Sequence, residues 1–361
     1  TEVVQGAFED IDDESLIQEQ NIVVTLTNFG YIKRQLVDTY KSQHRGGRGI
    51  SGQSTREEDY VEKLITTTTH HFLLCFTNTG RVFKMKGYNI PETSSRTARG
   101  TAIVNILKLQ EGEKIKNIIP VCNFDAEDQY LTIATKNGVI KKTSLASYAN
   151  INKNGLIAVN IREEDALVDA SLTTAEQEIM LVTKNGKAIR FKADDVRAMG
   201  RNSTGVRGIK LVGDDEVVGM VPVTEDGELL VISRKGMGKR TTLDGYKTQH
   251  RGGTGLITYK TTEKTGELVG CTLVGDDKDL LIVTDSGVVI RLATSEIPTL
   301  SRATSGVKLM RANDASIVDF AIVDHFEEEE DATITEEGEE SVSDVAPEAD
   351  TPSEDASEDN Q

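Results

Sequence analysis

The most regular feature of the chain is a run of β-branched and aliphatic residues that ends in a polar turn and a glycine. Each glycine is followed by a second, shorter apolar run, such as YIKR at 31–34 or VVIR at 288–291. Such a pattern predicts a β-hairpin, because glycine readily adopts the positive φ of a tight turn. The pattern occurs six times, at 24–30 (VTLTNFG), 74–80 (LCFTNTG), 132–138 (TIATKNG), 180–186 (MLVTKNG), 230–236 (LVISRKG) and 281–287 (LIVTDSG).

Two more strands are predicted in each repeat. A second glycine follows each hairpin glycine by 17 to 20 residues, and an apolar run comes after it, as at 101–106 and 206–211. A further run precedes the next hairpin, as at 217–223 and 268–274. Four strands in about 50 residues, repeated six times, are typical of a β-propeller with six blades. Helical periodicity is weak throughout, so the predicted fold is all-β.

The charge divides the chain of 361 residues into three parts. Residues 1–20 carry 7 acidic and no basic residues, and residues 327–361 carry 16 acidic and no basic residues. The segment between them holds the other 36 acidic residues and all 41 basic ones, so it is positive by 5 although the whole chain has a net charge of −18. We therefore expect an acidic linker arm at 1–20, a propeller at 21–326 and a disordered acidic tail at 327–361. The expected blades are 21–70, 71–125, 126–175, 176–225, 226–277 and 278–326.

Several classes of protein are disfavoured by what the sequence contains. No apolar run reaches 18 residues, so no membrane-spanning segment is predicted. The three cysteines, Cys75, Cys122 and Cys271, form neither a CxxC pair nor a disulfide framework. The five histidines are scattered, and no P-loop, GxSxG or HExxH motif occurs. We expect no metal site and no catalytic residues in this chain.

Basic residues keep register with the repeat in two sets. The first set lies four positions after each hairpin glycine: Arg34, Lys84, Lys142, Arg190, Arg240 and Arg291. The second set lies four positions before the second glycine, except in the third repeat, where Ile151 takes that position and Lys153 lies nearby: Arg45, Arg96, Lys153, Arg201, Arg251 and Arg302. In a radial fold these sets become rings, and we expect them to form a positive belt along the rim that suits a polyanion. Side chains alternate between the two faces of a strand, so each cation of the first set should lie on the same face as the apolar residue two positions earlier. We therefore expect either a bulge or a side chain that reaches round the edge.

One loop of the first repeat is rich in glycine and arginine. It consists of Gln43, His44, Arg45, Gly46, Gly47, Arg48 and Gly49, and the fifth repeat carries the variant QHRGGTG at 249–255. Glycines allow close approach of the backbone to a ligand, and guanidinium groups can bond two phosphate oxygens at once. The loop lacks a set of base-reading residues, so we expect little sequence preference.

These features resemble the C-terminal DNA-wrapping domains of the DNA gyrase A subunit. The loop at 43–49 resembles the seven-residue box of that family, with His44 where Arg or Lys is usual, and the six repeats resemble its β-pinwheel, in which neighbouring blades exchange a strand. The resemblance implies that 43–49 lets duplex DNA turn around the wheel and that the other loop cations line the path.

The resemblance also implies a larger assembly. The chain would join the rest of the gyrase A subunit, together with the gyrase B subunit, in an A₂B₂ enzyme of the bacterial cytoplasm. That enzyme would be associated with the nucleoid and would use ATP and Mg²⁺ to introduce negative supercoils. By this resemblance the domain itself needs no cofactor, does not cleave DNA, contacts no membrane and is monomeric when isolated.

Three alternatives remain at the level of sequence. The matching domain of topoisomerase IV resembles this fold but usually lacks an intact box. A propeller that acts as a scaffold for protein partners would need apolar patches on its loops. A propeller hydrolase would need clustered carboxylates or a metal set. Counterion release makes DNA binding steeply dependent on salt, which separates it from the last two functions.

The acidic tail provides a test of its own. Removal of residues 327–361 should tighten binding to duplex DNA at about 10 mM salt, because a tethered polyanion competes with phosphates for the cations. The gain should shrink as salt rises. Equal affinities of the full and truncated chains at low salt would contradict this prediction.

Overall fold

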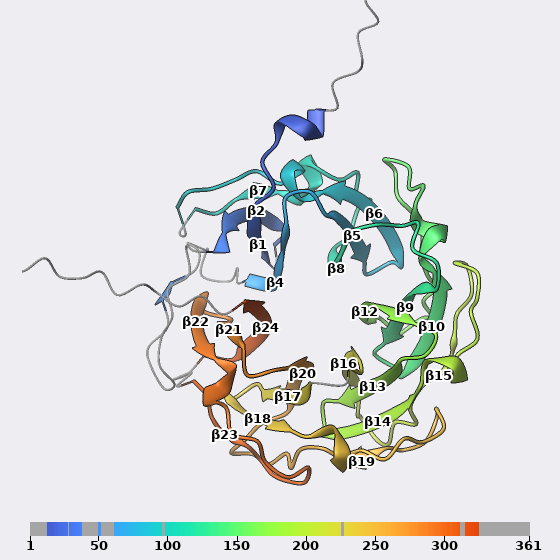
Figure 1. Cartoon of the computed structure of the whole chain (residues 1–361), viewed down its shortest axis with the longest axis vertical. Coiled ribbons are helices and arrows are strands. Elements are labelled where there is room, and N and C mark those ends of the chain that lie inside the picture. The colour runs from blue at the N-terminus through green and yellow to red at the C-terminus, as the bar shows by residue number, and fades with distance from the viewer. Residues whose placement is uncertain are drawn as a thin grey trace, which may run out of the picture. The chain divides into compact units, whose positions relative to one another are not determined.

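The computed structural model of the chain describes residues 13–27, 29–37, 50–51, 61–95, 98–224, 227–310 and 315–324. These residues form six four-stranded antiparallel sheets arranged around a central axis (Figure 1). The prediction of an all-β fold with six blades is confirmed. The tail at 327–361, the loop at 43–49 and Arg96 lie outside the described residues, so the interpretation of these segments stays a prediction.

Every blade is built on one of the predicted hairpins. The hairpin glycine has a positive φ in all six turns, between 77° and 82°. The first strands of the hairpins are β1 (Asn21–Thr27), β5 (Phe72–Thr77), β9 (Gln129–Thr135), β13 (Glu178–Thr183), β17 (Glu228–Ser233) and β21 (Lys278–Thr284). The second strands are β2 (Tyr31–Leu36), β6 (Arg81–Lys86), β10 (Val139–Ser144), β14 (Lys187–Lys192), β18 (Met237–Thr241) and β22 (Val288–Ala293).

One strand flanks each hairpin on the side of the axis and another on the outer side. The inner strands are β4 (Val61–Thr68), β8 (Ile115–Val121), β12 (Leu167–Thr174), β16 (Val217–Pro222), β20 (Leu268–Val274) and β24 (Ile317–Asp324). The outer strands are β3 (Ile50–Ser51), β7 (Thr101–Ala102), β11 (Leu156–Ile157), β15 (Val206–Arg207), β19 (Leu256–Ile257) and β23 (Val307–Lys308). Short 3₁₀ helices are η1 (Asp13–Leu16), η3 (Gly87–Asn89), η4 (Ile103–Asn105), η5 (Leu145–Tyr148), η6 (Ala193–Asp195), η7 (Leu243–Gly245) and η8 (Thr294–Glu296).

The outer strand of each blade comes from the next repeat of the sequence. Thus β7 pairs with β2, β11 with β6 and β15 with β10, and the same exchange continues around the ring. The last hairpin is completed by β3 of the first repeat, through pairing of Val289 with Ile50. The ring is therefore closed by the chain's own N-terminal repeat, and blades in space do not coincide with repeats in sequence.

The outer strands are shorter than the sequence pattern predicts. The runs at 101–106 and 206–211 read as full strands, but only two residues of each pair with a neighbour. The reason is a turn towards the neighbouring hairpin. The amides of Gly208 and Ile209 both donate to the carbonyl of Gly138, at 2.8 and 3.3 Å. In three other repeats the two residues at the same positions also donate their amides to the carbonyl of a hairpin glycine.

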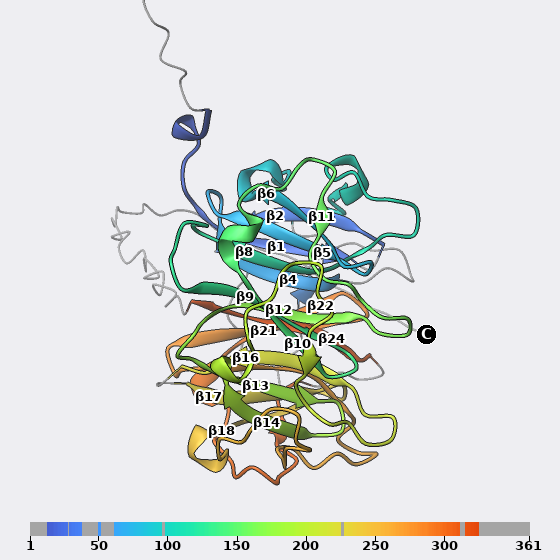
Figure 2. The same ribbon diagram turned by 90° about the vertical axis from the view of Figure 1, so that its right-hand side faces the viewer.

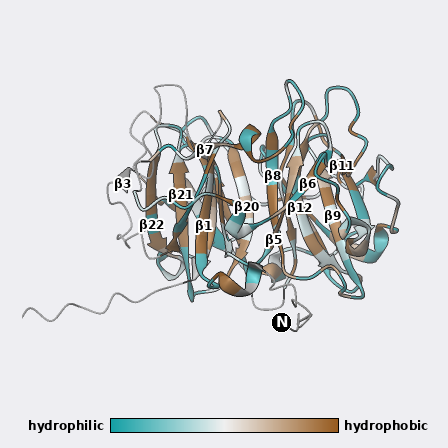
Figure 3. Cartoon of the chain, turned by 90° about the horizontal axis from the view of Figure 1, so that it is seen from above, coloured by the Kyte–Doolittle hydropathy of each residue, from teal (hydrophilic) through white to brown (hydrophobic). Residues whose placement is uncertain are grey.

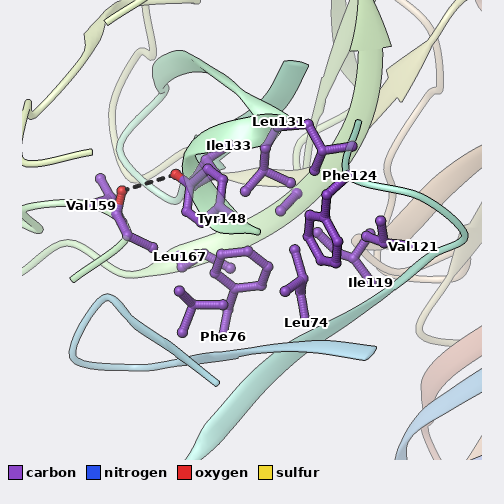
Figure 4. Close-up of a cluster of buried hydrophobic side chains, with 14 residues drawn as sticks. Leu74, Phe76, Ile119, Val121, Phe124, Leu131, Ile133, Tyr148, Val159 and Leu167 are labelled. Atoms are coloured by element: carbon purple, nitrogen blue, oxygen red, sulfur yellow. Dashed lines mark hydrogen bonds between the residues drawn. The ribbon is translucent and has the colours of Figure 1, made fainter. Parts of the chain in front are cut away.

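The hydrophobic core lies between adjacent blades. Figure 4 shows one such layer, in which Leu74 and Phe76 of β5 meet Leu131 and Ile133 of β9, and the Tyr148 hydroxyl donates to the Ala158 carbonyl. Apolar residues concentrate in the strands and polar residues in the loops (Figure 3). Because each core is shared by two sheets, a blade depends on its neighbours for burial.

A ring of polar and small residues surrounds the axis. Each inner strand contributes the residue that directly follows a β-bulge, and these residues border a cavity of about 340 Å³: Lys63, Asn117, Asp169, Gly219, Gly270 and Asp319. Asp169 accepts hydrogen bonds from the side chain of Asn117 and the amide of Met220, both at 3.1 Å, so it joins three blades. Burial raises the pKa of its carboxyl, although these donors and Lys63 oppose the shift.

The N-terminal arm docks on the turn between β4 and β5 through polar contacts. The Nε2 of His70 lies 2.8 Å from the Ile17 carbonyl, the Thr69 hydroxyl donates to Gln18, and Lys86 pairs with Glu14 at 2.7 Å. Leu16 of η1 is 76% exposed, and η1 stands out from the ring in Figure 2. The apolar side chain of Leu16 therefore stays in solvent.

A pair of glycines in one loop tests the role of backbone conformation. Gly205 has a φ of +98°, and a Cβ added there would lie 2.6 Å from the Ile140 carbonyl oxygen. Gly205→Ala should lower the free energy of unfolding by at least about 1–2 kcal/mol, measured by urea denaturation. Gly200→Ala is the matched control, because no atom lies within 4 Å of its added Cβ, and it should change stability by less than about 0.5 kcal/mol. Equal effects of the two substitutions would contradict this explanation.

Candidate nucleic-acid interface

The first set of repeated cations, which we call the latch cations, lies between blades. Five of them bond to the next repeat, either to its 3₁₀ helix or to the segment that leads from this helix to the outer strand, which we call the crossover loop. Arg34 Nε donates to the Ile90 carbonyl and Arg240 Nε to the Ile297 carbonyl, both at 2.8 Å. Lys84 makes the same kind of bond to the carbonyl of Ala149, whereas Lys142 and Arg190 bond to the carbonyls of Ala193 and Leu243, the first residues of η6 and η7. The latch cations therefore hold the exchanged segment in place.

Several latch cations are also covered and paired with carboxylates. Lys142, Arg240 and Arg291 are only 3%, 8% and 5% exposed. Arg190 lies 2.5 Å from Glu178, and Arg291 lies 2.6 Å from the buried Asp279. The expectation of an open belt is therefore wrong for Lys142, Arg240 and Arg291, because the fold places their charge inside a blade-to-blade contact.

The strand geometry explains this burial. The pairing of β1 with β2 and of β9 with β10 runs without a register shift, so no bulge turns the cation outwards. Instead, the crossover loop lies against the strand in a parallel bridge, as between Arg34 and Glu92 or Arg240 and Thr299. The sequence predicted either a bulge or a side chain that reaches round the strand edge, and these strands show neither.

The second set, which we call the rim cations, lies on the crossover loops. Arg201, Arg251 and Arg302 are partly exposed, and Lys153 is exposed. One guanidinium N–H of Arg251 bonds to the Arg207 carbonyl at 3.0 Å, and one of Arg302 bonds to the Ile257 carbonyl at 2.8 Å. These bonds tether each arginine to the outer strand of the preceding blade and hold it at the outer edge. Arg45 and Arg96 lie outside the described residues.

The glycine-rich loop is described only in its second copy, at 249–255. Gly252 has a φ of +83°, its amide donates to Gly208, and the Gly253 carbonyl accepts from the amide of Lys210. His250 is fully exposed. The loop therefore packs by its backbone against the outer edge of the neighbouring repeat and leaves side chains outside. Gln43, His44, Arg45, Gly46, Gly47, Arg48 and Gly49 themselves are not described.

Three buried lysines were missed by the sequence analysis. Lys33, Lys141 and Lys239 lie three positions after a hairpin glycine in alternate repeats, and each is at most 1% exposed. Their ammonium groups donate to carbonyls of the crossover loops, and burial lowers the pKa of each to about 8. Their repeat register was visible in the sequence, but a lysine in a strand does not by itself predict burial.

Further cations on the outer edge were also missed. Arg207 and Lys308 are exposed on the outer strands two positions after the second glycine, and Lys210 and Lys260 are exposed five positions after it. Together with the rim cations they place partly or fully exposed positive charge along the outer edge of several blades. Such a row can contact successive phosphates of a polyanion through charge-assisted hydrogen bonds.

The described part of the chain holds neither a cluster of metal ligands nor a membrane-spanning helix. Those residues contain no group of three or more His, Cys, Asp or Glu side chains placed to hold a metal ion. Within the same residues no helix is long and apolar enough to span a membrane.

Comparison with known proteins agrees with this geometry. The family model described as the DNA gyrase C-terminal domain, beta-propeller, matches six segments: 21–68, 71–122, 129–174, 177–224, 227–274 and 278–324. A solved structure of a DNA gyrase A C-terminal domain superposes with a TM-score of 0.77 at 27% identity, covering 84% of this chain and 99% of the other. The C-terminal domain of a DNA topoisomerase IV shares the fold, with a TM-score of 0.65 at 23% identity over 85% of this chain and 94% of that one.

Curated relatives are more similar in sequence. The DNA gyrase A subunit of Halalkalibacterium halodurans is 54% identical over 92% of this chain, and that of Clostridium acetobutylicum is 50% identical over 86%. The corresponding protein of Staphylococcus aureus is 42% identical over 98%. The aligned part is only 37–40% of the length of these relatives. The chain belongs to the family of DNA gyrase C-terminal domains with the β-propeller fold.

Proposed function

We propose that this chain binds duplex DNA along its outer edge and bends it around the wheel, with little preference for sequence. The observation that carries the proposal is the recurrence of partly exposed arginines on the crossover loops, at Arg201, Arg251 and Arg302. Because these loops follow one another around the ring, a duplex lying on the edge would meet a cation at each blade. Phosphate contacts of this kind give affinity and register but no direct base reading.

The energy of bending favours a distributed interface. Smooth bending of 20–30 base pairs by 40–90° costs on the order of 1–6 kcal/mol, and the cost grows with the square of the angle. A single loop with two arginines supplies too few charge-assisted bonds to offset a larger bend, at about 1.5–3 kcal/mol each. We infer that the loop at 43–49 closes the path, while the rim cations together provide most of the affinity.

The proposal extends to the parent protein. The chain would act as part of the DNA gyrase A subunit, with the gyrase B subunit in an A₂B₂ enzyme of the bacterial cytoplasm. That enzyme would introduce negative supercoils and use ATP and Mg²⁺ elsewhere in the assembly, and DNA cleavage would take place outside this chain. The topoisomerase IV alternative has less support, because the curated relatives named above are all gyrase subunits.

Two rim arginines test the interface. The double variant Arg201→Ala/Arg302→Ala should bind duplex DNA more weakly, and the slope of log K against log salt should become shallower by about 1.8, because each lost phosphate contact removes about 0.9. The slope is measured by fluorescence anisotropy between 50 and 300 mM salt, where ~0.9 per contact is resolvable.

Lys264→Ala is the control for this experiment. Lys264 is an exposed cation at the hairpin-turn end of its blade, where the Glu267 carbonyl accepts from the Arg234 amide, and it lies on the loop before β20, which is not a crossover loop. For Lys264→Ala, the slope of log K against log salt should equal that of the unsubstituted chain. An unchanged slope in the double variant would place DNA elsewhere, and a flat slope in the unsubstituted chain would refute DNA binding.

The glycine-rich loop tests wrapping separately from binding. With residues 43–49 changed to alanine, the chain should keep part of its affinity but no longer trap writhe when nicked circular DNA is bound and ligated. The control changes only Asn152 and Asn154 to alanine, two exposed uncharged residues of the corresponding loop in the third repeat, and should trap writhe as the unsubstituted chain does. Normal trapped writhe in the first variant would show that 43–49 is one contact among many.

A further inference from the structure

One position of the repeat holds a buried side chain of two different kinds. Three residues after the hairpin glycine, alternate repeats carry Phe83, Ile189 and Ile290, and these are at most 3% exposed. The other repeats carry Lys33, Lys141 and Lys239 at the same position, equally buried. Since the site accepts an apolar side chain, the fold as such does not need an ammonium group there. A buried charge is costly, so its presence calls for a specific partner.

The partners are carbonyl oxygens on the crossover loops. Lys239 Nζ lies 2.6 Å from the carbonyls of both Ser301 and Arg302. Lys141 Nζ bonds to the Arg201 carbonyl and, at 2.7 Å, to that of Ala158. Lys33 Nζ donates to Ala98 at 3.0 Å. Two of the three lysines therefore hold the backbone of a rim arginine itself, at a separation of about 60 residues in sequence.

The charged groups around these lysines are mainly the same arginines. Arg201 repels Lys141 and Arg302 repels Lys239, which adds to burial in lowering the lysine pKa values to about 8. The hydroxyl of Tyr148 donates to the Ala158 carbonyl beside Lys141, and burial raises its pKa to about 12. Burial also raises the pKa of Tyr246, near Arg302. The lysines are thus the groups that titrate near pH 8 in these clusters.

We propose that Lys33, Lys141 and Lys239 are positioning residues, which fix the crossover loops so that rim arginines face the phosphates of bound DNA. The inference rests on the proposed function and assigns the lysines no contact with DNA. Each ammonium draws a loop carbonyl inwards, and at Lys141 and Lys239 this carbonyl belongs to the rim arginine, whose side chain is thereby turned towards the outer edge. The repeat of Ile189, which lacks the lysine, receives a glycine-rich crossover loop instead, where an added Cβ on Gly253 would lie 3.5 Å from Ile189.

The same arrangement couples DNA binding to protonation. A phosphate beside Arg201 or Arg302 would offset the repulsion that the arginine exerts on the buried lysine, so the lysine would hold its proton more tightly. Near pH 8, where Lys141 and Lys239 are about half protonated, binding should then take up at most about one proton. A role confined to packing would produce no such uptake.

The experiment uses the double variant Lys141→Met/Lys239→Met of the full chain and a 30-base-pair duplex. Methionine keeps the unbranched shape and removes the donors. We expect the affinity for the duplex at pH 7 to fall about fivefold to tenfold, because two loop arginines are no longer held in place. We also expect faster hydrogen exchange of the backbone amides at 198–205 and 299–306. Calorimetry in buffers of different ionisation enthalpy should detect proton uptake at pH 8 in the unsubstituted chain and none in the variant. Ile189→Met is the matched control and should behave like the unsubstituted chain.

The pH dependence of stability shows whether the lysines titrate as stated. Their pKa of about 8 in the folded chain is below the ordinary 10.5, so between pH 8 and 10.5 the unfolded chain binds more protons. The free energy of unfolding should therefore rise with pH across this window, and the rise should be smaller in the double variant. Urea denaturation at pH 7 and pH 10 measures the difference.

Several results would overturn the inference. Unchanged affinity and exchange in a folded double variant would do so, as would the absence of proton uptake by the unsubstituted chain, a result that needs no variant to fold. If the unsubstituted chain showed no salt-dependent binding to DNA, the proposed function would fail first. Hydrogen exchange at the two loops would then still show whether the lysines hold them.

Discussion

Every blade of this wheel is completed by a strand that the next repeat supplies, and the backbone that delivers this strand must cross from one sheet to another. Within the crossing, carbonyl groups leave regular pairing and face the neighbouring blade. A buried carbonyl without a partner costs about 1–3 kcal/mol, so the exchange requires donors at a fixed place in every repeat. The latch cations supply them from the adjacent strand, as Arg34 does for Ile90 and Arg240 for Ile297.

This requirement separates two uses of positive charge. Four residues after the hairpin glycine, a cation serves the interior, where carboxylates such as Glu178 and Asp279 balance it. On the crossover loop, an arginine has only one or two carbonyls to satisfy and keeps part of its guanidinium group exposed. The mildly basic composition of the body is therefore divided between holding the ring together and forming its outer edge. The fold and the candidate interface depend on the same loops.

The axis is held differently from the edge. There the residues that follow the bulges are small or polar, and Asp169 links Asn117 with the amide of Met220 across three blades. The closing contact joins β22 to β3 of the first repeat, so the segment between β2 and β3, which includes residues 43–49, leads directly into the strand that closes the ring.

The sequence by itself determined the repeats, because hairpins are local: the polar turn and the glycine at 30, 80, 138, 186, 236 and 287 fix a positive φ within a few residues. The number of blades and the register of the cations follow from the same periodicity. Only the tertiary structure decided which cations are exposed. Arg240 and Arg302 both belong to the repeated pattern of basic residues. The crossover loop that lies about 60 residues after Arg240 covers the Arg240 side chain, whereas Arg302 is itself part of this loop. Burial of Lys33, Lys141 and Lys239, and the short outer strands, likewise depend on contacts between repeats, which no local pattern encodes.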